Sequence, residues 1–206
     1  MMSDPLLARL RAACQRWGQP IDDSQAGKLL TLLDNLLRWN QAYNLTAIRD
    51  RDEAFTLHLL DSLSLLPFLT GPTLLDVGTG PGFPALPLAI MRPDIAITAI
   101  DSNGKKIRFI RQMVHELGLA NVMPVQARVE QHQGQYQQIT SRAFAELKLF
   151  CDLTQHLLAP GGDWLAMKSQ SATAELAPLP AVLHAETLPL LVPGLQAERY
   201  LVRVRR

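Results

Sequence analysis

The sequence predicts an α/β fold in which a mostly parallel sheet carries helices on both faces. Short apolar runs rich in β-branched residues alternate with helix-length amphipathic segments from about position 71 onward. A glycine-rich turn joins the first apolar run to a helical segment, as in sheets that bind ligands at their strand ends. Positions 1–70 show only helical periodicity, so we expect a helical extension there and one compact core unit over 71–206.

The extension contains two predicted long helices. Leucines spaced along one face mark the first helix, which is expected to end near Trp39 and to be capped by Asp22 to Ser24. The second is expected from Asp52 to Leu66, because a proline follows and cannot continue a helix. Trp39, Tyr43 and Asn44 are expected to fasten these helices to the sheet rather than to contact a ligand.

The core is predicted from alternating strands and helices. Predicted strands cover Leu74–Val77, Ile95–Ile100, Val122–Ala127, Ile139–Arg142 and Trp164–Lys168, with helical segments at Ile107–Leu117 and Leu147–Leu158. The tail differs, because Val182–Leu191 and Tyr200–Val204 read as strands without a long helix between them. Strands joined in this way are expected to pair antiparallel.

Composition limits the class of protein. The chain has 206 residues, 48% of them hydrophobic, and a net charge of +1, so bulk charge does not indicate nucleic-acid binding. No apolar run is long enough for a membrane span, and arginines interrupt the N-terminus where a signal segment would need apolar residues. Cys14 and Cys151 form neither a disulfide framework nor a metal-ligand pattern. We expect a cytoplasmic monomer with no metal.

The glycine turn D-V-G-T-G-P-G-F, at positions 76–83, is the most informative motif. A nicotinamide-binding fingerprint would place its third glycine at position 83, which is Phe83, whereas here it comes at Gly82. With an acid at Asp76, the pattern D-x-G-x-G-x-G is that of methyltransferases that use S-adenosylmethionine. Its carboxylate suits a ligand with a cationic amino group and no pyrophosphate. The motif therefore predicts a Rossmann-like class I methyltransferase, with Gly78 and Gly80 beside the cofactor.

Four further residues are candidates for cofactor contacts. Asp101 ends the second predicted strand, where an acid can accept from both ribose hydroxyls; the alternative is a cap for the helix starting near Gly104. Val129 and Glu130 follow the third strand, where a backbone N–H and a carboxylate suit the adenine ring; Glu130 is otherwise a solvated loop acid. Phe83 is expected to line the cofactor pocket, and ordinary packing is the competing interpretation.

The end of the fourth predicted strand supplies candidates for the reacting end of the site. Arg142 is predicted there as a positioning group, able to hold the methionine carboxylate, a phosphate or guanine O6; a surface ion pair is the alternative. Phe144 could stack on a base or pack in the core. Lys168, at the end of the fifth strand, is the predicted RNA contact, with a merely solvated cation as the alternative. His58 and Asp61 share a helical face and are expected to form a structural hydrogen-bonded pair.

Several motifs, in order along the chain, resemble the glucose-inhibited division protein B family. They are W-N-Q-A-Y-N-L-T at 39–46, H-L-L-D-S at 58–62, the glycine loop, D-S with the basic residues at 105, 106 and 108, R-V-E at 128–130 and S-R-A-F at 141–144. The resemblance covers roughly positions 30–170 and implies methylation of guanine N7 in 16S ribosomal RNA, free or in the small subunit. Ala85 departs from the family's glycine, and only a local change is expected.

The chemistry implied by that resemblance is consistent with the residues. Guanine N7 has a free lone pair, so its methylation requires no general base, and the chain offers no proton-abstracting constellation. It has neither a Pro-Cys dipeptide nor the N/D-P-P-aromatic motif of amino-group methylases. Two alternatives remain: a methyltransferase of the same fold acting on a protein or small molecule, which the low net charge favours, and a non-catalytic S-adenosylmethionine sensor that binds the ribosome.

Overall fold

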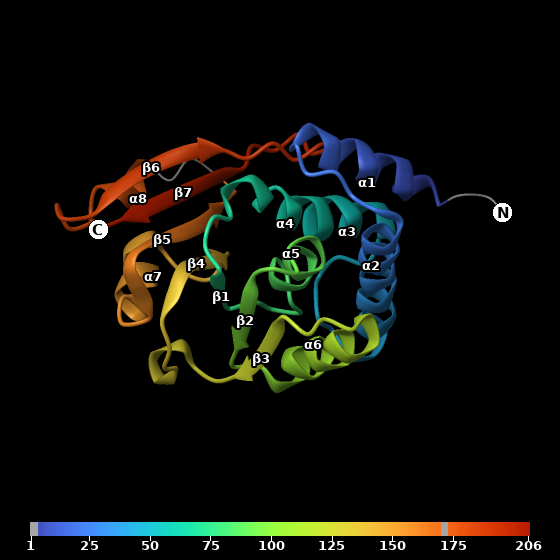
Figure 1. The fold of residues 1–206 in the computed structure, drawn as a ribbon, viewed down its shortest axis with the longest axis horizontal. Coiled ribbons are helices and arrows are strands. Elements are labelled where there is room, and N and C mark those ends of the chain that lie inside the picture. The colour runs from blue at the N-terminus through green and yellow to red at the C-terminus, as the bar shows by residue number, and fades with distance from the viewer. Residues whose placement is uncertain (1–3, 170–172) are drawn as a thin grey trace.

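A sheet of seven strands in the order β3-β2-β1-β4-β5-β7-β6 forms the centre of the molecule (Figure 1). The computed structural model describes residues 4–169 and 173–206. The strands are β1 (Thr73–Val77), β2 (Ala96–Asp101), β3 (Val122–Gln126), β4 (Tyr136–Arg142), β5 (Leu158–Lys168), β6 (His184–Pro189) and β7 (Tyr200–Arg205). β1 to β5 are parallel, and β7 is antiparallel to both β5 and β6. The predicted fold class and the antiparallel pairing of the tail strands are confirmed.

Helices cover both faces of the sheet. They are α1 (Pro5–Arg16), α2 (Asp23–Tyr43), α3 (Arg51–Ala54), α4 (Asp61–Leu63), α5 (Ala85–Met91), α6 (Gly104–Leu117), α7 (Leu147–Thr154) and α8 (Thr173–Leu176). Successive residues of β1 serve different faces: Leu74 packs in the core shared with α2, α5 and α6, whereas Leu75 and Val77 pack in the core shared with α7. This alternation is what a strand buried on both sides requires.

The helical extension packs directly on the core. Asp22 and Gln25 form a capping box at the start of α2, as the sequence predicted for the cap. Trp39 meets Phe109 of α6 edge-on at 5.6 Å between ring centroids, so it joins α2 to a helix of the core and not to the sheet itself. Leucines of α1 and α2 share one hydrophobic core with α5 and α6. The extension therefore buries the outer surfaces of α5 and α6, two helices of the core.

The second predicted helix of the extension is not a uniform α-helix. Residues Phe55–Leu60 form a π-helical turn between α3 and α4, and the helix ends at Leu63 rather than at Leu66. A separate 3₁₀ turn over Leu66–Phe68 contains the proline that was expected to end the helix. Proline is tolerated in the first turn of a helix, where its missing N–H is not needed. Pro67 can therefore stand in the first turn of this 3₁₀ element, which is separate from α4.

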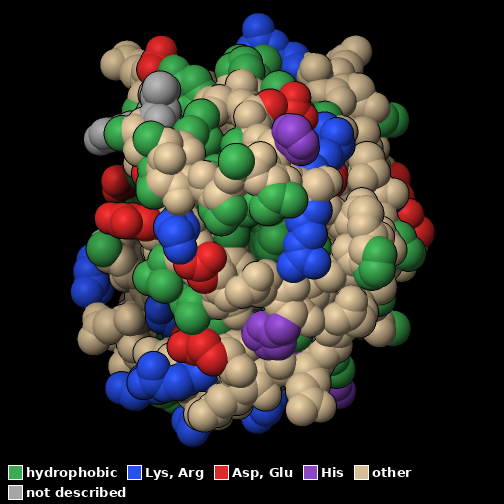
Figure 2. Space-filling model, turned by 90° about the vertical axis from the view of Figure 1, so that its left-hand side faces the viewer, with side chains coloured by type: hydrophobic (Ala, Val, Ile, Leu, Met, Phe, Trp, Pro, Cys, Tyr) green, Lys and Arg blue, Asp and Glu red, His purple; other side chains and the backbone are tan. Residues whose placement is uncertain are grey.

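The strand boundaries also differ from expectation at the edge of the sheet. β5 begins at Leu158, a residue assigned to the preceding helix in the prediction, and β6 is shorter than the predicted Val182–Leu191. β7 lies between β5 and β6, so the last strand of the chain is inside the sheet. Figure 2 shows the side of the molecule at the left of Figure 1, with hydrophobic side chains near its middle and several Lys and Arg side chains along its lower edge. Within the described residues, no helix is long and apolar enough to cross a membrane.

Candidate active site

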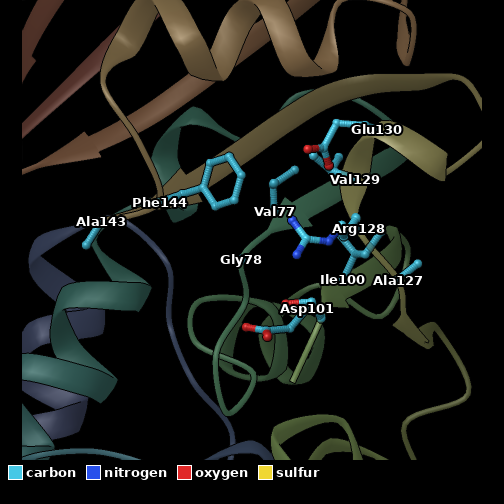
Figure 3. A pocket seen from close by; sticks show the side chains of 11 residues that line it. Val77, Gly78, Ile100, Asp101, Ala127, Arg128, Val129, Glu130, Ala143 and Phe144 are labelled. Atoms are coloured by element: carbon cyan, nitrogen blue, oxygen red, sulfur yellow. The ribbon is translucent and has the colours of Figure 1, made fainter. Parts of the chain in front are cut away.

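A cavity of about 330 Å³ lies at the carboxyl edge of the sheet. Its lining comes from the ends of four parallel strands and the loops that follow them: Val77, Gly78, Ile100, Asp101, Ser102, Ala127, Arg128, Val129, Glu130, Ala143 and Phe144. Figure 3 shows Asp101 and Glu130 at opposite ends of this cavity, with Phe144 and Arg128 on either side. We name it the first cavity. The carboxyl ends of parallel strands are where open α/β sheets bind ligands.

Asp101 connects the glycine loop to the start of α6. Its Oδ2 accepts from the N–H of Gly80 at 3.0 Å, and its Oδ1 accepts from the N–H of Asn103 at 2.8 Å. Asn103, not Asp101, caps α6, because its side chain accepts from Lys105 N and Lys106 N. Each carboxylate oxygen still has lone-pair capacity for a hydroxyl donor. The capping alternative for Asp101 is therefore wrong, and the side chain lines the first cavity.

The glycine loop takes its shape from positive φ angles and close approach. Gly78 has a φ of +65°, and a Cβ there would lie 2.6 Å from the Phe144 ring, so only glycine leaves this wall of the first cavity intact. The Phe144 ring is partly exposed and covers this point, which makes it a cavity residue rather than a core residue. Gly80 contributes its N–H to Asp101 and does not line the cavity.

Asp76 lies beneath the glycine loop, not on the cavity wall. The side chain is fully buried, and its Oδ2 accepts from Thr79 Oγ1 at 2.6 Å and from Ala85 N at 3.1 Å. Its Oδ1 has no partner among the described residues. Burial raises the pKa of Asp76 to about 6, while the bonds from Thr79 and Ala85 oppose that rise. Asp76 thus holds the loop against the start of α5, which begins at Ala85, the position where the family has glycine.

Phe83 is also placed differently from its expected position. It is buried and does not line the first cavity; its ring packs against His58 at 5.5 Å between centroids. The packing interpretation of Phe83 is the one observed. A glycine motif marks a turn, but it does not determine on which side of the turn the next side chain lies.

Val129, Glu130 and Arg128 follow β3 as expected. Val129 and Glu130 begin a 3₁₀ turn, Val129 is buried, and Glu130 is exposed at the cavity. Arg128 also lines the cavity, although it was part of a recognised motif without an assigned role. Its place directly after a strand, at the end of the sheet where ligands bind, would have identified Arg128 as a candidate cavity residue from the sequence.

A second cavity of about 390 Å³ adjoins the first. Its lining is Ile48, Leu57, His58, Asp61, Arg142, Ala143, Met167, Lys168, Ser169 and Arg199. Ala143 lines both cavities and has a φ of +54°, which is uncommon for a residue with a side chain. Arg142 therefore faces away from the first cavity, and the two predicted candidates Arg142 and Lys168 share the second.

Arg142 is held by residues of the extension. Its Nη1 donates to Leu57 O at 2.9 Å and to Asp61 Oδ2 at 3.1 Å, and its Nη2 lies 3.3 Å from His58 Nδ1. The predicted bond between His58 and Asp61 is thus replaced by contacts from each of them to Arg142. Asp61 Oδ1 also accepts from Arg199 Nε at 3.2 Å. Arg199 lies in the tail before β7, where no sequence pattern marked it.

Lys168 is partly buried at the end of β5. Its Nζ donates to Ala145 O at 3.0 Å and pairs with Glu175 Oε2 at 2.7 Å. The same Glu175 oxygen accepts from Leu147 N at 2.7 Å, at the start of α7. The lysine therefore braces the loop that carries Phe144, in addition to lining the second cavity.

The basic residues of the chain differ in how they are paired. Arg51 is bound to Asp4 and Asp34, and these hydrogen bonds raise its pKa above the ordinary arginine value. Four cations of α6 make no ion pair within the described residues; they are Lys105, Lys106, Arg108 and Arg111. These four cations of α6 are therefore available to a polyanion, and the first turn of α6 follows the cavity residue Ser102.

The cysteines lie apart from both cavities. Burial raises the pKa of Cys14 to about 11 and that of Cys151 to about 12. Over residues 4–169 and 173–206, no group of His, Cys, Asp and Glu side chains has the arrangement of a metal site.

Solved structures share this fold at low sequence identity. A SAM dependent methyltransferase from Aquifex aeolicus aligns with a TM-score of 0.56 and 17% identity, over 74% of this chain and 92% of that one. Precorrin-6y C5,15-methyltransferase from Geobacter metallireducens aligns with a TM-score of 0.53 and 14% identity, over 71% and 86% of the two chains. The fold is that of class I methyltransferases.

Sequence relatives are much more similar. The chain is 53% identical to "Ribosomal RNA small subunit methyltransferase G" of Chromohalobacter salexigens, over 97% of both chains. The protein of the same name from Chromobacterium violaceum is 48% identical, over 96% of both. The family model described as "GidB: rRNA small subunit methyltransferase G" matches residues 25–202. The chain belongs to the GidB family of small-subunit ribosomal RNA methyltransferases.

Proposed function

We propose that this chain transfers the methyl group of S-adenosylmethionine to N7 of a guanine in 16S ribosomal RNA. The observation that carries the proposal is the pair of adjoining cavities that share Ala143. The first has carboxylates at both ends, Asp101 and Glu130, and the second contains the cations of Arg142, Lys168 and Arg199. A cofactor on one side and an anionic nucleotide on the other would meet at the backbone of Ala143.

The first cavity suits S-adenosylmethionine. Asp101 has lone pairs for the ribose hydroxyls, and the Glu130 carboxylate has no partner within the described residues and suits the adenine amino group. Gly78 leaves room for close backbone approach, and Phe144 offers a ring face. When bound, the cofactor would supply an activated methyl group. The family and fold support this assignment.

The protein's contribution to such a reaction is alignment. Guanine N7 needs no proton removed before attack, so Arg142 acts by holding a ligand oxygen and not as a base. Arg142 faces the second cavity, which favours guanine O6 or a phosphate over the methionine carboxylate among its expected ligands. The buried carboxylate of Asp76 supports the glycine loop, and its contact with the cofactor stays a prediction.

Lys168 remains our candidate RNA contact, in competition with its bond to Glu175. A phosphate would have to replace that carboxylate or share the ammonium with it. Lys168→Ala should lower methyl transfer while S-adenosylmethionine binding survives, and Glu175→Gln should tighten RNA binding at low salt. A normal transfer rate for Lys168→Ala would leave the lysine only its bracing role.

Cofactor binding is tested by calorimetry with S-adenosylmethionine and its demethylated product. Asp101→Ala should weaken both by about 1.5–3 kcal/mol, because hydrogen bonding of the ribose to a charged acceptor is lost. Asp94→Ala is the matched control, since Asp94 pairs with Arg92 and lines neither cavity. Unchanged affinity in Asp101→Ala would contradict the assignment of that residue.

The reaction is tested by mapping methylation on 16S ribosomal RNA with and without the protein. N7-methylated guanine is cleaved after reduction and amine treatment, and the single-turnover rate at saturation should vary little between mildly acidic and neutral pH. Label that resists cleavage, with a steep pH dependence, would reject N7. Binding of S-adenosylmethionine with no transfer to RNA, free or in the subunit, would favour a sensor or another substrate.

We further propose that the protein acts as a monomer in the cytoplasm, where ribosomal RNA is the available substrate. Both cavities are lined by residues of this one chain. Light scattering at working concentration checks the monomer, and a stable dimer would contradict it.

A further inference from the structure

The guanidinium of Arg142 is fixed by a continuous set of contacts that begins in the extension. Arg142 is at the end of β4, yet its three acceptors are Leu57, His58 and Asp61. The Asp61 side chain is only 6% exposed and that of Arg142 is 19% exposed, so these contacts are largely shielded from water. Shielding strengthens such charge-assisted bonds.

The contacts determine the tautomer of His58. An arginine can only donate, so His58 Nδ1 must accept from Arg142 and the ring proton must be on Nε2. That proton points to Thr46 Oγ1, 2.8 Å away, and the same hydroxyl accepts from Ile48 N at 3.2 Å. A neutral ring is therefore required. Burial, together with the Arg142 charge, lowers the pKa of His58 to about 4, which agrees.

The backbone around these groups is itself constrained. Leu57 and His58 lie in the π-helical turn Phe55–Leu60, and such turns change the direction in which groups of a helix face. The loop carrying Thr46 is held by the buried Asn40, which accepts from Thr46 N at 2.9 Å and donates to Ile48 O at 3.1 Å. Asn40 and Thr46 thus fix the partner of His58 in place.

These bonds leave part of the guanidinium available. Of its five N–H groups, three meet Leu57, Asp61 and His58, and two have no partner among the described residues, one on Nε and one on Nη2. Arg142 lines the second cavity, so fixing the other three donors limits the directions in which these two can point. We propose that His58 is a positioning residue for methyl transfer: its neutral ring, oriented by Thr46, holds Arg142 so that its remaining donors meet an oxygen of the RNA nucleotide. This rests on the proposed function, because the nucleotide is its substrate.

Two substitutions at position 58 separate positioning from simple packing. Asparagine places its oxygen near the position of Nδ1 and can still accept from Arg142, whereas glutamine extends toward Thr46 and loses that acceptor. His58→Gln should lower the single-turnover methyl-transfer rate by about tenfold to a hundredfold, and His58→Asn by much less. S-adenosylmethionine affinity should change little in either. His115→Gln, on the exposed surface of α6, is the control and should be unaffected.

A double-mutant cycle tests whether His58 acts through Arg142. If it does, adding His58→Gln to Arg142→Lys should slow transfer no further. Equal losses for the glutamine and asparagine variants, or additive losses in the cycle, would overturn the proposal.

A second measurement does not depend on activity. In ¹⁵N-correlated NMR spectra of the whole protein, His58 should be the Nε2–H tautomer at neutral pH. The N–H protons of Arg142 should exchange slowly with water in the parent protein and rapidly in His58→Gln. An Nδ1–H tautomer, or unchanged arginine exchange, would overturn the positioning role even if no methyl transfer is seen. Absence of transfer with the expected tautomer and exchange would instead contradict the proposed function alone.

Discussion

At the scale of single residues, the half-buried His58 and the fully buried Asp76 affect stability with opposite dependence on pH. His58 has its pKa lowered to about 4 by burial and by Arg142, so the unfolded state binds its proton more readily. Its contribution to stability is complete above the ordinary histidine pKa and is lost as the pH falls toward 4. Asp76 has its pKa raised to about 6 by burial, so the folded state binds its proton more readily. Its contribution is complete at low pH and is lost as the pH rises through 6.

These two contributions nearly cancel between about pH 4 and pH 6, at about 1.4 kcal/mol per pH unit each. Asp76→Asn should remove one of them. Relative to the parent protein, this variant should then lose about 3 kcal/mol of unfolding free energy as the pH falls across that interval. His58→Asn should show the opposite relative trend. Urea unfolding at several pH values measures both, and a pH dependence identical to the parent's in both variants would contradict the assigned pKa values.

At the scale of elements, the turn between β1 and α5 has glycines with different tasks. Gly82 has a φ of +92°, and a Cβ there would lie 2.6 Å from the buried Leu86 side chain. Gly82→Ala should cost about 3 kcal/mol of unfolding free energy, through strain and overpacking together. Gly80, at +62°, has open space around it, so Gly80→Ala should cost only the strain of about 1 kcal/mol.

Gly78→Ala should act on binding instead. An added Cβ would meet the Phe144 ring, which is partly exposed and able to move, so stability should fall only by a strain similar to that at Gly80 while the first cavity changes shape. Calorimetry should show a larger loss of S-adenosylmethionine affinity for Gly78→Ala than for Gly80→Ala. Equal affinities in the two variants would indicate that the Phe144 position does not matter for the cofactor.

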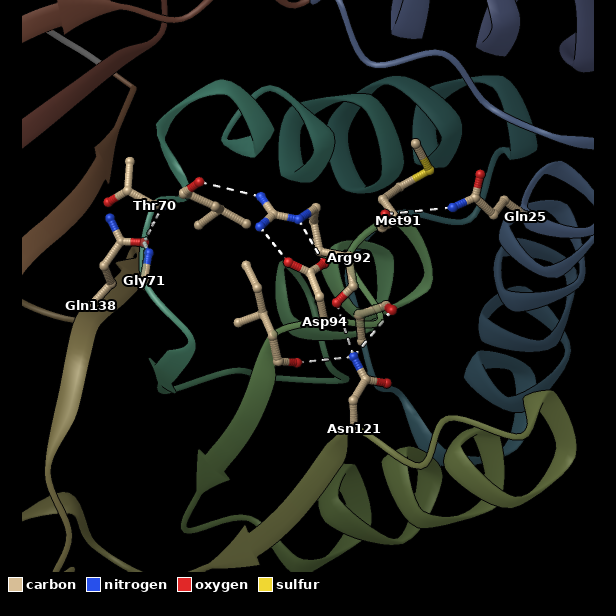
Figure 4. Close-up of polar contacts among 11 residues, drawn as sticks. Gln25, Thr70, Gly71, Met91, Arg92, Asp94, Asn121 and Gln138 are labelled. Atoms are coloured by element: carbon tan, nitrogen blue, oxygen red, sulfur yellow. Dashed lines mark hydrogen bonds and ion pairs between the residues drawn. The ribbon is translucent and has the colours of Figure 1, made fainter.

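At the amino ends of the strands, the side chain of Asn121, the residue before β3, lies close to several backbone carbonyls. Asn121 Nδ2 lies 3.2 Å from Ala89 O, 3.1 Å from Arg92 O and 3.0 Å from Ile95 O, so it binds the end of α5 and the chain leading into β2 (Figure 4). Asn121→Ala should destabilise the protein by about 1–3 kcal/mol, because buried carbonyls lose their donor. Thermal unfolding measures this loss. S-adenosylmethionine affinity of the folded variant should be unchanged. A binding defect would indicate that the amino ends of the strands are coupled to the cavity at their carboxyl ends.

At the scale of the whole molecule, the extension and the strand–helix core share one hydrophobic interior. Leu29, Leu33 and Leu36 of α2 are fully buried in the cluster that contains Phe109 and Met113 of α6. Trp17 Nε1 donates to Leu191 O at 2.9 Å, and Asp61 binds Arg199, so the extension also contacts the tail. Position 71 is therefore a boundary between structural motifs. We infer that it is not a boundary between independently folding units.

Truncation checks this inference. A fragment of residues 71–206 should expose the apolar faces of α5 and α6 and should show no cooperative thermal transition. Adding a 1–70 fragment should restore a folded complex, because the missing surface is supplied again. A fragment of 71–206 that folds cooperatively and binds S-adenosylmethionine on its own would contradict the shared-core argument.

The alternation of strands and helices, and the places of Gly78, Asp101, Val129 and Glu130 in the lining of the first cavity, were determined by the sequence alone. Parallel strands bring their carboxyl ends to one edge, so Gly78, Asp101, Val129 and Glu130 had to lie near one another once the strands were recognised. The tertiary structure decided what local patterns do not contain. Arg142 turns toward Asp61, which precedes it by 81 residues, because a buried carboxylate of the packed extension is the partner that offsets its charge. For the same reason, only the packed fold shows that Asp76 supports the loop from below and that β7 enters the sheet beside β5.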